Sequence, residues 1–278
     1  MSNPFVRLRK KMKDSPVFMG ILNVTPDSFS DGGRYTNQHS AVQQALRMAE
    51  EGAEIIDIGG ESTRPGAKTV SPQEEAERVL PVIQALKDKV PLISIDTRNA
   101  AVMKTALEAG AGMINDVTAL THDPQSLSIA TSFDVPVCLM HMRGNPQEMQ
   151  NAPKYESIVD EVLEYLLERT TACLTAGIKR ENIIIDPGIG FGKTPAHNLA
   201  LLKNLDRFVA TGFPVLLGTS RKSFIEKISA DQSTPDERLG GSLASVLWGW
   251  NKGVSFFRVH DVRETAQALK IYQAIEQA

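Results

Sequence analysis

The sequence predicts a single (β/α)8 barrel, in which eight parallel strands alternate with helices. Eight short apolar runs recur along the 278 residues, and their starts lie about 34 residues apart, the length of one strand–helix unit. Each run is nearly continuous in apolar residues, as expected of parallel strands that are buried on both faces. Most of the segments between the runs carry a helical pattern, and this alternation predicts a parallel sheet.

The eight predicted strands are rich in Ile, Val and Leu. They span Val17–Leu22, Glu54–Ile58, Pro91–Ile95, Gly112–Val117, Pro136–His141, Ile183–Asp186, Pro214–Gly218 and Ser255–Val259. Eight units favour a closed barrel over an open doubly wound sheet, and no change in composition divides the chain. We therefore predict one barrel domain over residues 17–278. Residues 1–16 are basic and lack the apolar stretch of a signal peptide, so we expect a solvated N-terminal arm.

Local signals mark where helices begin and end. The runs Ser71–Glu74 and Thr234–Glu237 each place a hydroxyl residue, a proline and a glutamate at the spacing of a capping box. Four glycines follow helical stretches and are expected to end them, namely Gly52, Gly110, Gly177 and Gly212. Two connections after strands, residues 23–38 and 59–72, are too long and too rich in Gly, Pro, Ser and Asp for ordinary turns. We predict them as long flexible loops 1 and 2, at the end of the barrel where active sites lie.

The composition excludes several classes of protein. Thirty basic and 33 acidic residues give a net charge of −3, which argues against a nucleic-acid partner. The cysteines, Cys138 and Cys173, form no CxxC motif, so we expect neither a disulfide framework nor a zinc site. No apolar run reaches the roughly 18 residues that a membrane span needs. We expect a cytoplasmic protein without membrane or nucleic-acid partners.

Hydrogen-bond acceptors follow several of the predicted strands. Asp96, Asn115 and Asp186 stand at the ends of strands 3, 4 and 6. The carboxyl ends of barrel strands meet on one rim, so these groups are expected to lie close together. Two carboxylates and an amide suit a flat heterocycle that presents several N–H donors.

Cationic groups follow the last two strands. Lys222 comes after strand 7, Arg258 and His260 come with strand 8, and Ser220 opens the next helix. This is the usual phosphate-binding side of a barrel, and a helix N-terminus favours an anion. The rim is therefore expected to hold an acceptor-rich pocket beside a cationic one. This indicates either a heterocycle with an anionic leaving group or two substrates, one of them acidic.

Two apparent motifs carry little weight. The run from Gly188 to Thr194 has three residues before its Gly-Lys-Thr, whereas a nucleotide P-loop needs four. Its glycines are better suited to a tight turn beneath a ligand, with Phe191 packed against that ligand. The five histidines show no metal-binding spacing.

Several blocks of residues resemble one enzyme family. Residues 20–33 (GILNVTPDSFSDGG) and 57–66 (DIGGESTRPG) resemble the two opening signatures of the dihydropteroate synthase family. Its remaining blocks match residues 94–97, 114–116, 186–193, 220–224 and 258–261. The resemblance covers about residues 17–275.

This resemblance implies a TIM barrel and a transferase of folate biosynthesis. Such enzymes condense 6-hydroxymethyl-7,8-dihydropterin pyrophosphate with 4-aminobenzoate, use Mg²⁺, and release 7,8-dihydropteroate and pyrophosphate. The family is the target of sulfonamides, and its members are usually homodimers. We expect the leaving group to depart before the amine attacks, because an electron-rich pterin can carry the resulting cation while loops 1 and 2 exclude water.

The resemblance also assigns residues by position. The pterin would be held by Asp96, Asn115, Asp186 and Lys222. The pyrophosphate would be held by Asn23, Arg258 and His260, with Asn23 also reaching the metal. The aminobenzoate would be framed by Thr63, Arg64, Pro65, Phe191, Ser220 and Lys222. The groups implied in catalysis are Asn23, Asp96, Lys222, Arg258 and His260. Phe29 and Asp31 would lie on loop 1, and Phe29 and Pro65 sit where inhibitor sensitivity is often tuned.

Two other functions are considered. Pterin-binding modules of folate-dependent methyltransferases share similar Asp and Asn positions, but the segments Ser62–Gly66, Ser220–Phe224 and Arg258–His260 supply sites for a second substrate and a pyrophosphate. A phosphate-handling barrel isomerase or aldolase is the second alternative. A Schiff-base aldolase would need a lysine inside the barrel with a lowered pKa. Lys222 lies beside Ser220, a position that better suits contact with an anion or a heterocycle.

Overall fold

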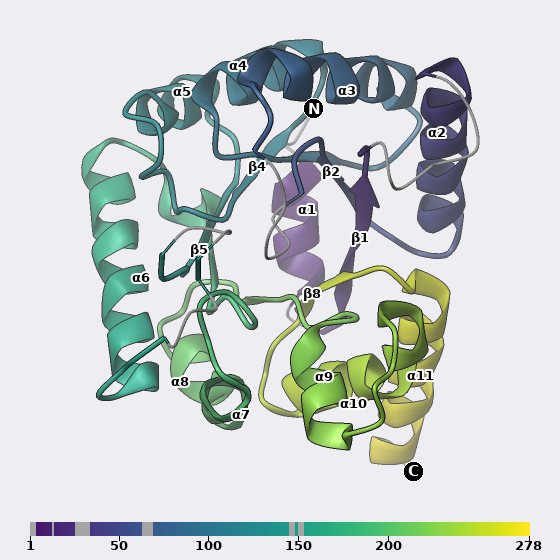
Figure 1. Cartoon of the computed structure of the whole chain (residues 1–278), viewed down its shortest axis with the longest axis vertical. Helices are drawn as coiled ribbons and strands as arrows, with labels where there is room; N and C mark the ends of the chain where they lie inside the picture. Colours follow the sequence, from purple (N-terminus) through teal and green to yellow (C-terminus); the bar gives the residue numbers. More distant parts are fainter. Residues whose placement is uncertain (1–3, 13, 26–33, 63–68, 145–147, 150–152) are drawn as a thin grey trace.

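Eight parallel strands form a ring at the centre of the computed structural model (Figure 1), which describes residues 4–12, 14–25, 34–62, 69–144, 148–149 and 153–278. The strands are β1 (Val17–Asn23), β2 (Ile55–Gly59), β3 (Ile93–Asp96), β4 (Met113–Asp116), β5 (Val137–Met140), β6 (Ile183–Asp186), β7 (Leu216–Leu217) and β8 (Phe256–Val259). They pair in the order β6-β5-β4-β3-β2-β1-β8-β7, and a bridge between Ile185 and Val215 joins β6 to the segment before β7. The predicted barrel and its eight strands are confirmed.

Helices surround this ring. They are α2 (Arg34–Glu50), α3 (Pro72–Leu86), α4 (Ala100–Ala109), α5 (Ser126–Phe133), α6 (Ile158–Thr175), α7 (Pro195–Lys203), α8 (Leu205–Val209), α9 (Ser223–Ser229), α10 (Leu239–Asn251) and α11 (Val262–Glu276), with 3-10 turns at Arg180–Asn182 and Pro235–Arg238. None of the described helices is long and apolar enough to cross a membrane.

Both predicted start signals lie where helical structure begins. The Ser71 hydroxyl accepts a hydrogen bond from the Glu74 N–H, whereas the Glu74 carboxylate pairs with Arg78. Thr234 forms a complete capping box with Glu237 at the 3-10 turn that leads into α10. The four predicted terminal glycines all have positive φ angles, a conformation that glycine adopts without steric cost.

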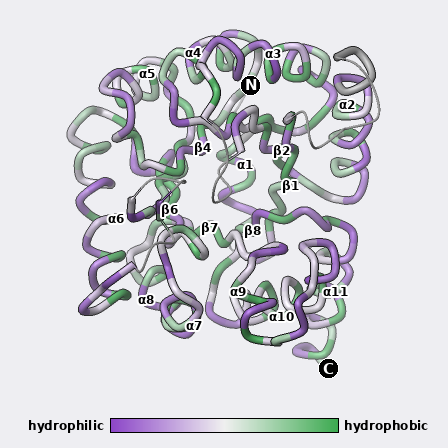
Figure 2. Tube along the Cα trace, in the orientation of Figure 1, coloured by the Kyte–Doolittle hydropathy of each residue, from purple (hydrophilic) through white to green (hydrophobic). Residues whose placement is uncertain are grey.

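Side chains along each strand alternate between two apolar clusters. Those facing into the ring form an inner cluster that includes Met19, Ile55 and Phe256. Those facing outward pack against the helices, as Ile56 and Ile58 do. Figure 2 shows the resulting hydrophobic stretches along β1 and β2. Because both faces are covered, the strands are apolar almost throughout.

The N-terminal residues correct one prediction. Residues 4–11 form a helix, α1 (Pro4–Lys11), instead of a solvated arm, and Figure 1 shows it behind the middle of the ring. Phe5 is fully buried, and Leu8 and Met12 pack against the inner cluster. Those three residues lie on one face of a helix, and they cover apolar side chains at the start of the strands. The basic residues between them obscured this pattern in the sequence.

Candidate active site

Polar side chains replace apolar ones where the strands approach their carboxyl ends. In β2, Ile55 belongs to the inner cluster and Asp57, two residues later, faces the same way. In β8, Phe256 is followed in the same manner by Arg258. Since successive inward positions are two residues apart, a polar layer is built directly above the apolar one.

Arg258 lies at the centre of this layer. Its Nε donates to Asp57 Oδ2 at 2.6 Å, and its Nη2 donates to Asp96 Oδ2 at 2.7 Å. Asn115 Nδ2 donates to the same Asp57 oxygen at 2.9 Å. The structure therefore brings the acceptors Asp96 and Asn115 together, as predicted. It does not, however, keep the cations on a separate side of the rim, because Arg258 lies among the acceptors.

Burial and the shared guanidinium act in opposite directions on Asp96. Burial raises the pKa of Asp96 to about 7; the attraction of Arg258 opposes this shift, and the repulsion of Asp57 adds to it. Burial lowers the pKa of Arg258, but Asp57 and Asp96 outweigh that effect and raise it above its usual value. Asp96 can therefore gain or lose a proton near neutral pH.

Lys222 approaches the opposite part of the ring. It precedes the first turn of α9, its ammonium donates to the Ile189 carbonyl, and it lies 4.7 Å from the centre of the Phe191 ring. Burial lowers the pKa of Lys222 to about 8, against the attraction of Asp186. Burial also raises the pKa of Asp186, and Lys222 opposes that shift. The two groups thus form a second mixed pair of acceptor and cation.

A glycine-rich turn connects this pair to the barrel. The Gly188 N–H donates to Asp186 Oδ1 at 2.7 Å, and the Gly190 N–H donates to Asn198 Oδ1 at 2.8 Å. Gly188 has a φ of +68°, and a Cβ there would lie 2.0 Å from the His141 carbonyl oxygen. Only glycine fits this position. The two N–H groups already have acceptors within the protein, so the turn is not a phosphate-binding P-loop.

The remaining predicted residues lie around the same rim or outside the described residues. The Ser220 Oγ is 2.9 Å from His260 Nδ1 and accepts from the His260 backbone N–H at 3.2 Å. Asn23 ends β1 and pairs in register with Gly59 of β2. Thr63, Arg64 and Pro65, together with Phe29 and Asp31, fall outside the described residues.

The residue roles predicted from the sequence do not include Asp57, although it stands among the polar residues at the end of the second predicted strand. It is fully buried and binds both Arg258 and Asn115. Its signal was present, because a carboxylate inside the otherwise apolar strand Ile55–Gly59 needs a buried partner. That partner, Arg258, lies 201 residues further along the chain, so spacing alone could not identify it.

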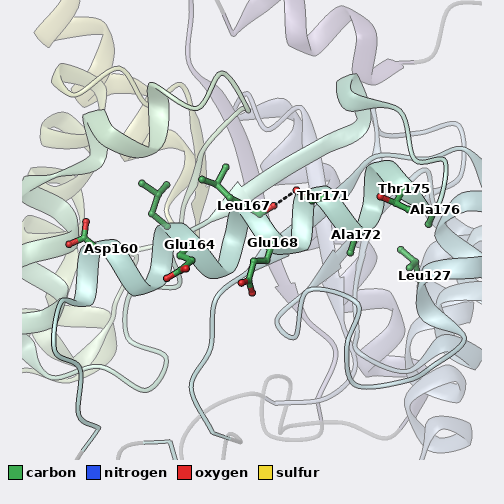
Figure 3. A pocket seen from close by; sticks show the side chains of 10 residues that line it. Leu127, Asp160, Glu164, Leu167, Glu168, Thr171, Ala172, Thr175 and Ala176 are labelled. Carbon is green, nitrogen blue, oxygen red and sulfur yellow. Dashed lines mark hydrogen bonds between the residues drawn. The ribbon is translucent and has the colours of Figure 1, made fainter.

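A large hollow in the described part of the chain lies away from the strand ends. It measures about 950 Å³ and follows the outer face of α6, where Leu127 of α5, Leu167 and Thr171 line it (Figure 3). None of the strand-end residues contributes to it. The chemistry of the rim, and not the size of a hollow, therefore identifies the candidate site.

Comparison with known proteins agrees with this geometry. The sequence model of the pterin binding enzyme family matches residues 19–260. The dihydropteroate synthase of Haemophilus influenzae is 49% identical over 264 residues, which cover 95% of each chain. A structure of Xanthomonas albilineans dihydropteroate synthase with 4-aminobenzoic acid has a TM-score of 0.89 and 47% identity, over 95% of this chain and 94% of that one. The same enzyme in complex with 7,8-dihydropteroate has a TM-score of 0.86 and 44% identity, over 95% of each chain. This chain belongs to the dihydropteroate synthase family.

Proposed function

We propose that this chain is a transferase that joins 6-hydroxymethyl-7,8-dihydropterin pyrophosphate to 4-aminobenzoate, giving 7,8-dihydropteroate and pyrophosphate. The observation that carries the proposal is the polar layer above the inner apolar cluster. There Asp96, Asn115 and Asp186 lie with Arg258 and Lys222 at the carboxyl ends of the strands. A flat heterocycle with N–H donors and an anionic tail would match this mixture of acceptors and cations.

The pterin would bind at the acceptors. Asp57 accepts one N–H of Asn115 and so orients its amide, while Gly188 orients the Asp186 carboxylate. A preoriented carboxylate or amide loses little freedom when a ligand binds, which favours affinity. Lys222 would contact the ring from the side of Phe191.

The pyrophosphate would bind at Arg258, His260 and Asn23. The bonds to Asp57 and Asp96 use two of the five guanidinium N–H groups of Arg258. The others can donate to phosphate oxygens, which are strong charge-assisted acceptors. His260, held by Ser220, stands on the segment that follows β8.

The donor set is compatible with Mg²⁺. Among the described residues no group of three or more His, Cys, Asp and Glu could hold a metal ion. Mg²⁺ commonly takes one or two protein oxygens and completes its shell with substrate phosphates and water, and the Asn23 amide oxygen suits that role. When bound, the ion would neutralise charge that develops on the pyrophosphate.

We propose that departure of pyrophosphate precedes attack by the amine. Arg258 and His260 would stabilise the charge on the leaving group, and Asp96 and Asp186 would lie near the cation left on the pterin. The aryl amine is neutral at pH 7, so its attack needs no strong general base. Phe191 and Ser220 would frame the aminobenzoate together with Thr63, Arg64 and Pro65.

We also propose that the protein is a cytoplasmic homodimer. Both cysteines are buried and free, as suits a reducing compartment. Large apolar side chains are exposed on α7, α10 and α11, and a hollow of about 540 Å³ lies between α10 and α11. Exposed apolar patches of this kind mark surfaces where proteins associate.

The decisive experiment measures pyrophosphate release from the pterin pyrophosphate with and without 4-aminobenzoate, and identifies the product by mass. We expect release that depends on the amine and a product of the mass of 7,8-dihydropteroate. Pterin binding without such a product would instead support the methyltransferase-type binding module.

A further inference from the structure

A lysine–histidine pair lies buried behind the glycine-rich turn. Lys193 is 2% exposed and His141 is 6% exposed. The Lys193 Nζ lies 2.9 Å from His141 Nδ1, and it also donates to the carbonyls of His141 at 3.2 Å and Phe191 at 3.0 Å. Each N–H group of the Lys193 amine therefore has an acceptor within reach. Burial lowers the pKa of Lys193 well below its usual value, and the attraction of Asp186 opposes this shift.

The histidine is suited to a fixed role as acceptor. Burial lowers the pKa of His141 to about 3, and the neighbouring Lys193 lowers it further. The ring also packs edge to face against Tyr165, with 5.0 Å between the ring centres. His141 therefore stays neutral across the physiological range, and its Nδ1 can accept from Lys193 throughout.

The pair is connected to the candidate active site through residues 188–191. Lys193 fixes the Phe191 carbonyl from behind the turn. On the other side, Lys222 donates to the Ile189 carbonyl and lies over the Phe191 ring. The close approach of Gly188 to the His141 carbonyl brings the same turn against the end of β5.

We propose that Lys193 is a positioning residue for the reaction, with His141 as its fixed acceptor. Together they hold the turn in the shape that presents the Phe191 ring and the Ile189 carbonyl to Lys222. This inference rests on the proposed function. Burying an ionisable amine costs folding free energy, and an apolar side chain would fill the same space at a lower cost. We infer that Lys193 is present despite this cost because it fixes the shape of the turn.

The test uses Lys193→Met, which removes the donors and keeps a similar length. We expect the KM for 4-aminobenzoate to rise about tenfold, with kcat within about threefold of wild type, because the turn shapes a binding surface rather than the leaving-group site. Hydrogen exchange at the amides of residues 188–191 should be faster in the substrate-free variant. His141→Phe removes the Nδ1 acceptor, one of the three, and should raise the KM and the exchange rate by smaller amounts. This second variant decides the question if Lys193→Met does not fold.

Asn182→Ala is the matched control. Asn182 is buried at the opposite end of β6, where its amide donates to Asp134. This variant should lower the melting temperature without changing the KM or the exchange of the turn. Unchanged exchange and an unchanged KM in both Lys193→Met and His141→Phe would overturn the inference. Absence of amine-dependent pyrophosphate release in the wild type would instead refute the proposed function, and the exchange experiment would still decide whether Lys193 shapes the turn.

Discussion

Arg258, within β8, contacts the acceptors as well as the proposed pyrophosphate site. It neutralises two buried carboxylates, Asp57 and Asp96, and we propose that it also receives the pyrophosphate. The guanidinium N–H groups that Asp57 and Asp96 leave unused would donate to the anionic tail, while the second oxygen of Asp96 would accept from the pterin. On this proposal, Arg258 couples the two ends of one substrate.

Replacement of Arg258 tests this coupling. Arg258→Ala should lower kcat by roughly 10² to 10³, the usual cost of losing a group that stabilises developing charge. It should also destabilise the protein, because Asp57 and Asp96 lose their shared cation. Arg258→Lys keeps one positive charge and should lose less of each. A steady-state kcat for the alanine variant within about threefold of wild type would contradict the assignment.

The pH dependence follows from two shifted groups. Asp96 must be ionised to accept from the pterin, and its pKa is about 7, so kcat/KM should fall as the pH drops below that value. Lys222 must be protonated, and its pKa is about 8, so kcat/KM should also fall above pH 8. Lys222→Arg should remove the alkaline limb, because a guanidinium stays charged. A flat profile between pH 6 and 9 would argue against both roles.

The eight strands could be predicted from the sequence, whereas the helix α1 could not. A strand buried on both faces shows as an apolar run, which needs no knowledge of its neighbours. Only Phe5 and Leu8 of α1 and Met12 just after it are apolar at helical spacing, and the basic residues around them resemble a solvated segment. What decided its structure was the uncovered inner cluster, which exists only once the barrel has closed. Likewise, the pairing of Asp57 with Arg258 needs β1 to lie between β2 and β8.

The role of α1 in stability can be measured. Phe5→Ala should lower the free energy of unfolding by about 3–5 kcal/mol, since it empties a fully buried aromatic site. Val6→Ala, on the same helix but 39% exposed, is the control and should have little effect. Urea unfolding provides the comparison. The KM for 4-aminobenzoate should stay unchanged in both variants, because α1 covers the end of the barrel opposite the rim. Equal losses of stability would show that Phe5 does not seal the barrel.

Along the barrel axis, the residues that stabilise the fold and the residues of the candidate site occupy opposite ends. The inner apolar cluster fills the end where the strands begin, and the ionisable groups gather where they finish. The class of ligand was therefore predictable from the strand ends, because closure of the ring brings all of them to one rim. The substrates themselves were implied only by the family resemblance. The position of Arg258 among the acceptors could not be predicted from the sequence, since it depends on which side chains reach across the ring. Loop 2 contains the predicted Thr63, Arg64 and Pro65, and loop 1 contains Phe29 and Asp31; their roles stay predictions.

The outer surface offers a test of the proposed homodimer. Four large apolar side chains are exposed on α7, α10 and α11, namely Leu199, Trp248, Ile271 and Ile275. These helices are neighbours, since Trp248 of α10 donates to a carbonyl of α7 and Ile271 of α11 lines the hollow beside α10. An isologous interface would bury this face on both protomers and remove its apolar area from water.

Sedimentation velocity should detect a dimer in the wild type and a monomer after Ile271→Asp combined with Ile275→Asp, because both carboxylates would be buried without partners. The control is Leu167→Asp, which places a charge in the hollow along α6, on a different side of the barrel. It should leave the dimer intact. If only Leu167→Asp dissociated the dimer, the interface would have to include α6. A monomeric wild type would refute the proposed homodimer. Since the described strand-end contacts among Asp57, Asp96, Asn115 and Arg258 form within one chain, monomeric variants should keep measurable turnover.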